Sequence, residues 1–386
     1  MSVATYLSQA SALQQDPNLT PSQRIQSVCN AYDQAIKSAH DEGNYPKDQL
    51  AQIFRLYAQF LQSSQLYNQA CDKFKKALKI YRVFAHKGDP TFTALMATTL
   101  NELGFVHWKM HDYSKAEPLF TEALQHYRHL APSNPSLYEP EVAKSLNHLG
   151  TCFQETEQYD KAQPLYNEAL QIYRHYAQSN PNLFDAKVAS TLNYIAALYD
   201  DTHQYLEAEK SYQEVLQIYR RLVALDAPTY EPYLALTLNH LCTLYDNHDQ
   251  TTEAEQAYRE LLQIYRRLVV VDPTQYEPYL ALTLNNLGVL CYFTSQFTDS
   301  ERYLTETLST YRHLATLDAP TYEPDVAMTL GNLSELYGIT LGRKSEALTF
   351  ANEALTIYQR LAKHNAKKYQ PNISSLTEKI QTITQK

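Results

Sequence analysis

The sequence predicts an all-α fold in which antiparallel helix pairs stack one after another. The blocks that begin at Tyr230, Tyr276 and Tyr322 align without a gap, and each starts 46 residues after the one before. A fixed period of roughly 20 to 50 residues indicates an array of repeated supersecondary units. Glycine is scarce, at 8 residues, and alternating Val and Ile residues are few, which favours helices joined by short turns over strands.

The period extends over most of the 386 residues through two series of aromatic side chains. One series opens each unit, and the other lies in its second half, so each unit is expected to contain a first helix, a short polar turn and a second helix. The opening series is Phe92, Tyr138, Phe184, Tyr230, Tyr276 and Tyr322, and the second is Tyr81, Tyr127, Tyr173, Tyr219, Tyr265 and Tyr311.

The chain divides into one array and two ends. Residues 1–47 do not follow the period and are expected to form N-terminal capping helices, the second of which starts after Thr20 as its cap. Residues 48–362 are expected to form seven helix pairs, and residues 363–386 a C-terminal capping segment whose helix spans Pro371–Gln385. A helix-turn-helix DNA-binding module is a less favoured alternative for the N-terminal end, because that segment has few Lys and Arg residues.

Two local features are expected to shape the helices of the array. The YEP motifs place a proline near the start of four first helices, and we expect it in the first helical turn, where a missing N–H costs no hydrogen bond. The last unit carries one extra residue, which the spacing places near 341–343. The YEP prolines are Pro140, Pro232, Pro278 and Pro324.

Charge is distributed unevenly. The net charge is −9, but the segment Tyr138–Thr321 contains 25 acidic and 12 basic residues, whereas the two flanks together contain 17 and 21. Nucleic-acid binding needs basic residues along the working face, so no nucleic-acid partner is expected for the central array. The chain has neither a signal-peptide pattern nor an apolar stretch long enough for a bilayer, so we expect a soluble, cytoplasmic protein without a membrane partner.

Patterns for catalysis, cofactors and metals are absent or incomplete. The sequence contains no phosphate-binding glycine loop and no GxSxG motif. Its five cysteines have no CxxC spacing and are expected to be buried, reduced thiols. His107 and His111 lie four residues apart but lack an evident third ligand. We therefore expect a protein that is not an enzyme and that binds neither metal nor cofactor.

Small residues recur in the middle of the first helices. A second small residue follows twelve positions later in most units, and a large aromatic residue lies four positions beyond it. Small residues at paired sites let two antiparallel helices approach closely, and the aromatic side chain fills the space beside them. The first small series is Ala58, Gly104, Gly150, Ala196, Cys242, Gly288 and Ser334, and the aromatic series is Phe74, Phe120, Tyr166, Tyr212 and Tyr258.

This combination resembles the signature of the tetratricopeptide repeat (TPR) family. One unit shows it in full as Leu149, Gly150, Phe153, Ala162, Tyr166 and Ala169. The units are longer than is usual in the family and are similar to the extended variety of kinesin light chains and many bacterial arrays. The resemblance covers residues 48–362 and implies a right-handed superhelical solenoid whose first helices line a concave groove, where peptides bind.

The resemblance also implies which side chains face the groove. An asparagine three positions before the small residue recurs in five units, and its carboxamide suits either a bound peptide backbone or a bond between neighbouring helices. The next position varies, which makes it the better candidate for selecting partner side chains, while Asp200 and Asp246 favour a partner with basic residues. The asparagines are Asn101, Asn147, Asn193, Asn239 and Asn285; the variable residues are Glu102, His148, Tyr194, His240, Asn286 and Asn332; further candidates are Trp108, Lys144, Gln154, Asp200, Asp246 and Tyr292.

Together these patterns predict a non-catalytic scaffold or adaptor that binds an extended segment of a partner protein. Two alternatives stay open. In the first, the array is a regulatory or sensing subunit of a bacterial effector enzyme such as a caspase-like peptidase. In the second, it is a structural protein that self-assembles through its tyrosine-rich outer faces. The sequence specifies neither the partner nor the oligomeric state.

Overall fold

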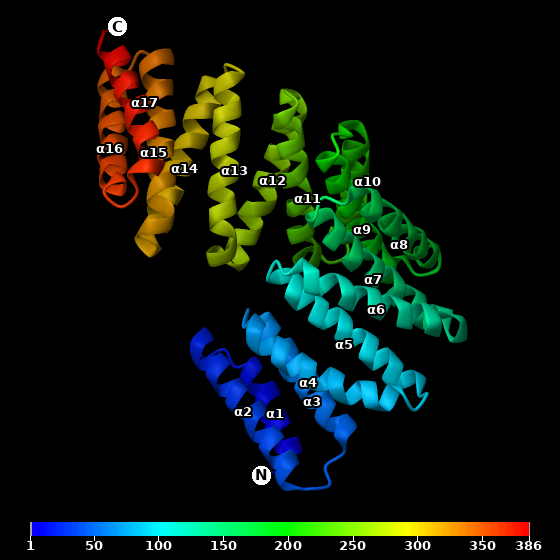
Figure 1. The fold of residues 1–386 in the computed structure, drawn as a ribbon. Coiled ribbons are helices and arrows are strands. Elements are labelled where there is room, and N and C mark those ends of the chain that lie inside the picture. The colour runs from blue at the N-terminus through cyan, green and yellow to red at the C-terminus, as the bar shows by residue number, and fades with distance from the viewer. Residues whose placement is uncertain (1, 386) are drawn as a thin grey trace. The chain divides into compact units, whose positions relative to one another are not determined.

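The computed structural model describes residues 2–385, which form helices joined by short connections and contain no strand (Figure 1). The chain divides into two compact units within helix α10 (Tyr205–Val223), the first ending at Ser211 and the second starting at Tyr212. The first unit contains α1 (Val3–Gln14), α2 (Pro21–Asp41), α3 (Lys47–Ser63), α4 (Tyr67–Ala85), α5 (Pro90–Lys109), α6 (Tyr113–Leu130), the 3-10 turn Ala131–Ser133, α7 (Pro135–Glu155), α8 (Tyr159–Ser179) and α9 (Pro181–Asp201).

The second unit contains α11 (Ala227–Asn247), α12 (Thr251–Val271), α13 (Pro273–Phe293), α14 (Phe297–Leu317), α15 (Ala319–Glu335), α16 (Lys344–Ala362) and α17 (Ala366–Gln385). Helices that follow one another in the chain pack together from α3 to α9 in the first unit and from α11 to α17 in the second. The odd-numbered helices from α3 to α15 are the first helices of the pairs, and the even-numbered helices from α4 to α16 are the second. This arrangement confirms the all-α fold of stacked helix pairs.

The two ends are helical, as the sequence predicts. Thr20 caps α2 and forms a capping box with Gln23, so two side chains satisfy backbone donors at the helix start. Helix α17 starts at Ala366, five residues before the predicted start at Pro371, and packs on α16. Within residues 2–385 no helix is long and apolar enough to cross a membrane.

The predicted position of the YEP prolines is wrong. Helix α7 starts at Pro135, so Pro140 is its sixth residue and lies in the second turn. In α11, α13 and α15 an aspartate caps the helix further upstream than the motif suggests, as Asp226 does by accepting a hydrogen bond from the backbone N–H of Thr229 at 3.3 Å. The internal proline leaves one carbonyl without a donor, which in α7 belongs to the exposed Ser136.

The turns between first and second helices share one backbone conformation. In six of them a non-glycine residue has φ between 54° and 60°, and the next backbone N–H donates to the carbonyl five residues back, as Gln158 does to Phe153 at 2.8 Å. This is the Schellman arrangement that ends many helices. The left-handed residues are Gln65, His111, Glu157, His203, Asp249 and Ser295, and Gly342 takes the same place in the last pair.

The extra residue of the last unit lies earlier than predicted. Ser334 still follows Gly288 by 46 residues, but Gly342 follows Ser295 by 47. Between them Leu336–Thr340 form a π-helical turn, which takes up one residue more than an α-helical turn. The insertion is therefore placed in 336–340 and not near 341–343.

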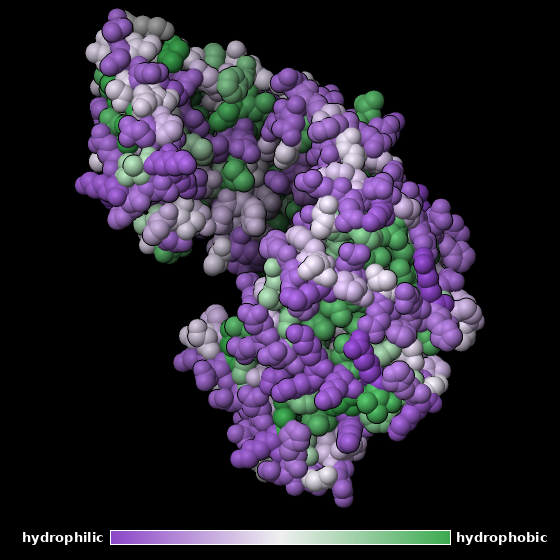
Figure 2. Space-filling model, in the orientation of Figure 1, coloured by the Kyte–Doolittle hydropathy of each residue, from purple (hydrophilic) through white to green (hydrophobic). Residues whose placement is uncertain are grey.

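The predicted close approach of the two helices within a pair is confirmed at the glycines. A Cβ atom on Gly104 would lie 2.7 Å from Cε1 of Phe120, and one on Gly150 would lie 2.6 Å from Cε1 of Tyr166. The ring of Tyr166 is fully buried, so it fills the space that the missing side chain leaves. On the face shown in Figure 2, apolar residues gather over α4 to α6, while hydrophilic residues cover most of the rest.

Neighbouring second helices are joined by a repeated ion pair. In the first unit Arg82 contacts Glu122 at 2.8 Å and Arg128 contacts Glu168 at 2.7 Å. The same spacing of 40 residues recurs in the second unit for Arg220–Glu260 and Arg266–Glu306. These side chains are about half exposed, so each pair contributes at most about 1 kcal/mol to stability.

The cysteines are free thiols, as expected. Cys71, Cys152, Cys242 and Cys291 are buried, whereas Cys29 is only partly buried. Burial raises the pKa of the Cys152 thiol to about 12 and that of Cys291 to about 11, so both thiols are neutral at pH 7.

Candidate functional site

The predicted asparagines in the first unit bond to the next first helix. Asn101 donates from Nδ2 to the hydroxyl of Ser145 at 2.8 Å, and Asn147 donates to the hydroxyl of Thr191 at 2.7 Å. Both asparagines are buried, with exposed fractions of 2% and 6%. Each hydroxyl in turn donates to the carbonyl four residues earlier, as Ser145 does to Glu141 at 2.9 Å. These two carboxamides therefore hold neighbouring first helices together.

Sequence reasoning missed the hydroxyl partners, although they follow the same period. A Ser or Thr lies two positions before each of the five asparagines, Thr329 takes the same place before Gly331, and all six are almost completely buried. Only a small hydroxyl can accept from an asparagine while it donates to its own helix. The series is Thr99, Ser145, Thr191, Thr237, Thr283 and Thr329.

In the second unit the carboxamides form a longer chain of hydrogen bonds. Asn332 donates to Asn285 at 3.3 Å, Asn285 donates to Asn286 at 3.5 Å, and Asn286 donates to the hydroxyl of Tyr258 at 3.2 Å. Tyr258 donates to Asp246 at 2.5 Å. This series of hydrogen bonds links side chains of α15, α13, α12 and α11. Because its last acceptor is the carboxylate of Asp246, the series ends at a negative charge.

A cavity of about 510 Å³ in the first unit brings together two predicted residues, Glu102 and Lys144. Arg55, which the sequence did not single out, contacts Glu102 through two hydrogen bonds of 2.7 and 2.8 Å. Burial opposes the charge of Arg55, but its bonds to Glu102 outweigh this and raise the pKa of the guanidinium. Leu137, which is exposed, and Tyr138 complete a wall on α7. The cavity thus combines paired charges with apolar surface.

Trp108 and His148 belong to one aromatic cluster in the first unit. The ring of Trp108 stacks on Phe105 with centroids 5.8 Å apart, and the imidazole of His148 lies 5.0 Å from the Phe120 ring. Lys109 lies 4.9 Å above the Trp108 ring. Burial lowers the pKa of His148 to about 3, and the nearby Lys144 acts in the same direction. His148 is therefore neutral at physiological pH and packs as part of this aromatic cluster.

The other predicted residues of the first unit are more accessible. Tyr194 is 37% exposed and stacks on Tyr166 with centroids 5.6 Å apart. Gln154 accepts a hydrogen bond from Tyr166 and donates to Asp201 at 2.7 Å. Asn193 and Asp200 are both partly buried. Tyr194 therefore presents the largest accessible ring among the predicted residues of this unit.

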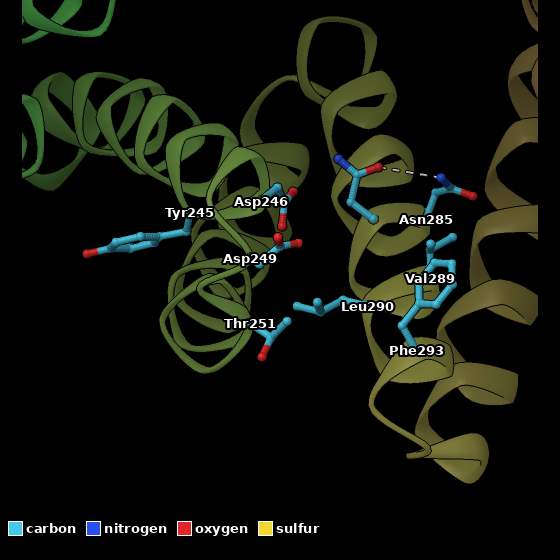
Figure 3. Close-up of a pocket in the computed structure, with 9 residues that line it drawn as sticks. Tyr245, Asp246, Asp249, Thr251, Asn285, Val289, Leu290 and Phe293 are labelled. Carbon is cyan, nitrogen blue, oxygen red and sulfur yellow. Dashed lines mark hydrogen bonds between the residues drawn. The ribbon is translucent and has the colours of Figure 1, made fainter. Parts of the chain in front are cut away.

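The second unit contains a cavity of about 410 Å³ between α11 and α13. Asp246, Asp249 and Thr251 line one side, and they face α13 across the space in Figure 3. The wall on α13 consists of Asn285, Asn286, Val289, Leu290 and Phe293. Burial raises the pKa of Asp246, which the hydrogen bond from Tyr258 opposes. The cavity brings the predicted residues Asp246, Asn285 and Asn286 together beside an apolar wall.

The remaining predicted residues of the second unit lie along the same first helices. Tyr292 donates to Glu335 at 3.4 Å. Both line a smaller cavity of about 60 Å³ with Asn332. His240 lies 5.8 Å from the Tyr212 ring, edge to face. Asn239 is partly buried on α11.

Packing creates one polar cluster that the sequence did not suggest. Sγ of Cys71 lies 3.8 Å from Nε2 of His107, and Nδ1 of His107 lies 3.6 Å from the carboxylate of Asp112. Burial raises the pKa of the Cys71 thiol and lowers that of His107, so both groups are neutral at pH 7. Among residues 2–385 no three His, Cys, Asp or Glu side chains are arranged to hold a metal ion.

Comparison with known families matches this architecture. Profiles described as tetratricopeptide repeat match residues 49–129, 95–175, 188–226, 234–273 and 326–365. The chain belongs to the tetratricopeptide repeat family. The matches cover most of the predicted array, with 274–325 as the longest stretch outside them, and confirm the resemblance on which the residue assignments depend. A comparison with curated proteins finds no match.

Solved structures with a similar fold include BtubC (BKLC) from P. vanneervenii, a kinesin-light-chain-like repeat protein. It shares 22% identity with a TM-score of 0.52, over 64% of this chain and 92% of that one. The apo form of RapI shares 14% identity with a TM-score of 0.54, over 81% of this chain and 99% of that one. A STAND protein with a tetratricopeptide repeat sensor from Pyrococcus horikoshii shares 13% identity with a TM-score of 0.58, over 99% of this chain and 49% of that one.

Proposed function

We propose that this protein is a non-catalytic scaffold or adaptor whose first helices bind an extended segment of a partner protein. The observation that carries the proposal is the pair of cavities, one in each unit, that lie on first helices and combine charged, carboxamide and apolar side chains. Tetratricopeptide repeats generally bind proteins or peptides, and this surface offers both hydrogen-bonding groups and apolar contact area.

The burial of individual residues divides the predicted site into two roles. Asn101 and Asn147 support the proposal indirectly, because they hold the first helices in register. Lys144, Tyr194 and Asp246 are exposed, so they are the side chains that we propose to contact the partner. The chemistry of the second group then decides which partner binds.

A pull-down from the source lysate tests the proposal. The wild-type chain is compared with a variant carrying Lys144→Ala, Tyr194→Ala and Asp246→Asn, and retained proteins are identified by mass spectrometry. A matched control carries Gln171→Ala and Gln263→Ala on exposed positions of second helices. We expect a protein retained by the wild type and the control but lost from the groove variant, with unchanged helical circular dichroism. Equal retention by all three variants would refute the assignment.

A regulatory or sensing role is the second candidate. It is favoured by the similarity to the STAND protein with a repeat sensor, because this chain matches 49% of that protein and so corresponds to a part of it. As a separate subunit the array would restrain or release an effector enzyme. Recovery of an enzyme as the retained partner, together with a change in its activity when the array is added, would favour this role.

A further inference from the structure

The first helices of the second unit carry an exposed apolar face. Its members are Tyr233 and Leu236 on α11, Tyr279 and Leu282 on α13, and Met328 on α15, and each side chain is between 36% and 51% exposed. The tyrosines recur at the 46-residue period, and so do the two leucines and the methionine. The face therefore consists of two rows that run from one first helix to the next.

Helix α13 has apolar residues on both sides. Leu284 and Leu287 are buried against neighbouring helices, whereas Tyr279, Leu282 and Phe293 are exposed, Phe293 by 76%. The exposed residues continue through Asn286 and Val289 at spacings of three and four, which place them on one side of the helix. A helix at a protein surface normally has a polar outer side. In Figure 2 apolar residues are visible over α13 between hydrophilic neighbours.

The first helices that carry this face contain acidic residues, several of which already pair with basic residues of other helices: Glu231 with Arg267, Glu323 with Arg360 and Glu335 with Lys379. Helices α11, α13 and α15 contain six acidic residues and no Lys or Arg. The Arg residues of the repeated ion pairs lie on second helices. Asp246, Asp325 and Glu335 lie on the same helices as the exposed rows, and Asp249 lies in the following turn. A segment that covers the apolar face would therefore meet the exposed carboxylates of Asp246 and Asp249, at the end of α11 and in the turn that follows it.

Helix α17 shows that lysines already lie beside the acidic residues of α15. Lys379 of α17 forms an ion pair with Glu335, and the charge of Lys368 on the same helix acts on Asp325. Leu376 of α17 lies between these two lysines in the sequence. Its side chain is buried, and its Cδ2 atom lies 3.7 Å from the position that a Cβ of Gly331 would take. A segment with lysines and a buried leucine thus already packs at the end of the row of first helices.

We propose that the apolar face of the second unit, formed by Tyr233, Leu236, Tyr279, Leu282 and Met328, binds a partner segment that carries apolar side chains flanked by Lys or Arg. The proposal rests on the proposed function and specifies its partner. Neighbouring packed helices lie roughly 10 Å apart. A segment in the polyproline II conformation has three residues per turn and rises about 3.1 Å per residue, so its side chains three residues apart lie on one face at about this spacing. Apolar side chains three residues apart would reach successive first helices, and a Lys or Arg that flanks them would approach Asp246 and Asp249, about 15 Å along α11 from Leu236.

Fluorescence anisotropy with three labelled peptides tests the proposal on the full chain. The first peptide has leucine at every third position with lysine and serine between, the second has glutamate in place of lysine, and the third has serine in place of leucine. We expect the first peptide to bind at least about tenfold more tightly than either of the others, a difference of about 1.4 kcal/mol in binding free energy. Its affinity should fall as salt is raised, because charge contributes to it.

Two double variants locate the binding. Leu236→Ser with Leu282→Ser should weaken the first peptide about tenfold. Leu225→Ser with Leu317→Ser should leave it within about twofold, because these leucines are also exposed but lie away from the face, Leu225 in the turn after α10 and Leu317 at the end of α14. Both variants must keep the circular dichroism of the wild type. Equal binding to both variants, or equal binding of the lysine and glutamate peptides, would overturn the proposal.

Two further results separate this inference from the proposed function. If no peptide binds, yet a lysate protein is retained by the wild type and lost from the groove variant, the inference is wrong and the scaffold function stands. If the chain dimerises in sedimentation experiments and Leu236→Ser with Leu282→Ser abolishes the dimer, a second copy covers the face and the inference is again wrong. Binding of the first peptide that is lost only in this variant supports it.

Discussion

Replacing glycines in first helices by alanine should change stability in opposite directions at two sites. A helical Gly→Ala substitution stabilises a protein by about 1 kcal/mol when the added methyl group has room. At Gly331 the nearest atom to the new Cβ is Cδ2 of Leu376 at 3.7 Å, an ordinary contact. At Gly150 the new Cβ would lie 2.6 Å from Cε1 of Tyr166, 2.9 Å from Cδ1 and 3.0 Å from Cζ.

The ring of Tyr166 has little freedom to move away. It is fully buried, and its hydroxyl donates to Gln154 at 2.9 Å. Overpacking of this kind costs about 1 to 3 kcal/mol, which exceeds the gain in helix propensity. We therefore expect Gly150→Ala to lower the free energy of unfolding by about 1 kcal/mol and Gly331→Ala to raise it by about the same amount.

Urea unfolding followed by circular dichroism measures both changes. Because repeat arrays can unfold in parts, hydrogen exchange of α7 and α8 for the first variant, and of α15 to α17 for the second, assigns each change to its surroundings. The reasoning is refuted if Gly150→Ala stabilises the chain as much as Gly331→Ala does. Such a result would mean that Tyr166 repacks without loss.

Three further perturbations test other features of the structure. Thr191→Val leaves the buried Nδ2 of Asn147 without its acceptor and should cost about 2 kcal/mol, most of which the double variant with Asn147→Leu should recover in urea unfolding; a negligible cost in the single variant would contradict the bond. His148 takes up a proton near pH 6.5 in the unfolded chain, but only near its pKa of about 3 in the folded chain. The stability that depends on its neutral imidazole is therefore complete above pH 6.5 and is lost as the pH falls toward 3. Between pH 6.5 and 5 the wild type should lose about 2 kcal/mol more than His148→Gln, and equal losses would exclude a neutral buried imidazole. Glu157→Gly should raise the stability by about 0.5 to 1 kcal/mol in thermal melting, because φ is 58° at this position, and a lower melting temperature would contradict this.

The fold follows from the sequence because the same contacts repeat every 46 residues. Gly150 and Tyr166 show this directly, since the spacing that suggested a close helix approach is the spacing that the structure contains. The partner of Asn147 was also within reach of the sequence, because Thr191 belongs to a series with the same period. A Ser or Thr recurs two positions before each asparagine. Comparison of the two series predicts that each asparagine bonds to the hydroxyl group of the following repeat.

Other features were not predictable from spacing alone. The start of α11 depends on whether Asp226 or the YEP motif sets the helix boundary, and the side-chain hydrogen bond of Asp226 to the backbone decides it. The contact between Cys71 and His107 occurs in one pair only, so no periodic pattern reveals it. The role of each groove residue depends on burial, which differs between Asn147 and Tyr194 although both lie on first helices.

The π-helical turn at Leu336–Thr340 has a consequence for how such arrays change length. It takes up the additional residue within one turn, so the contacts of the following pair keep their relation to the preceding one. The ring centroids of Tyr358 and Tyr369 lie 6.0 Å apart, close to the 6.5 Å between the ring centroids of Tyr311 and Tyr322 one pair earlier. A single-codon insertion at the end of a first helix is thus absorbed locally. A unit with one residue more at this point therefore keeps the packing of the helix that follows, whereas an insertion beside the buried glycines would shift every contact of the pair.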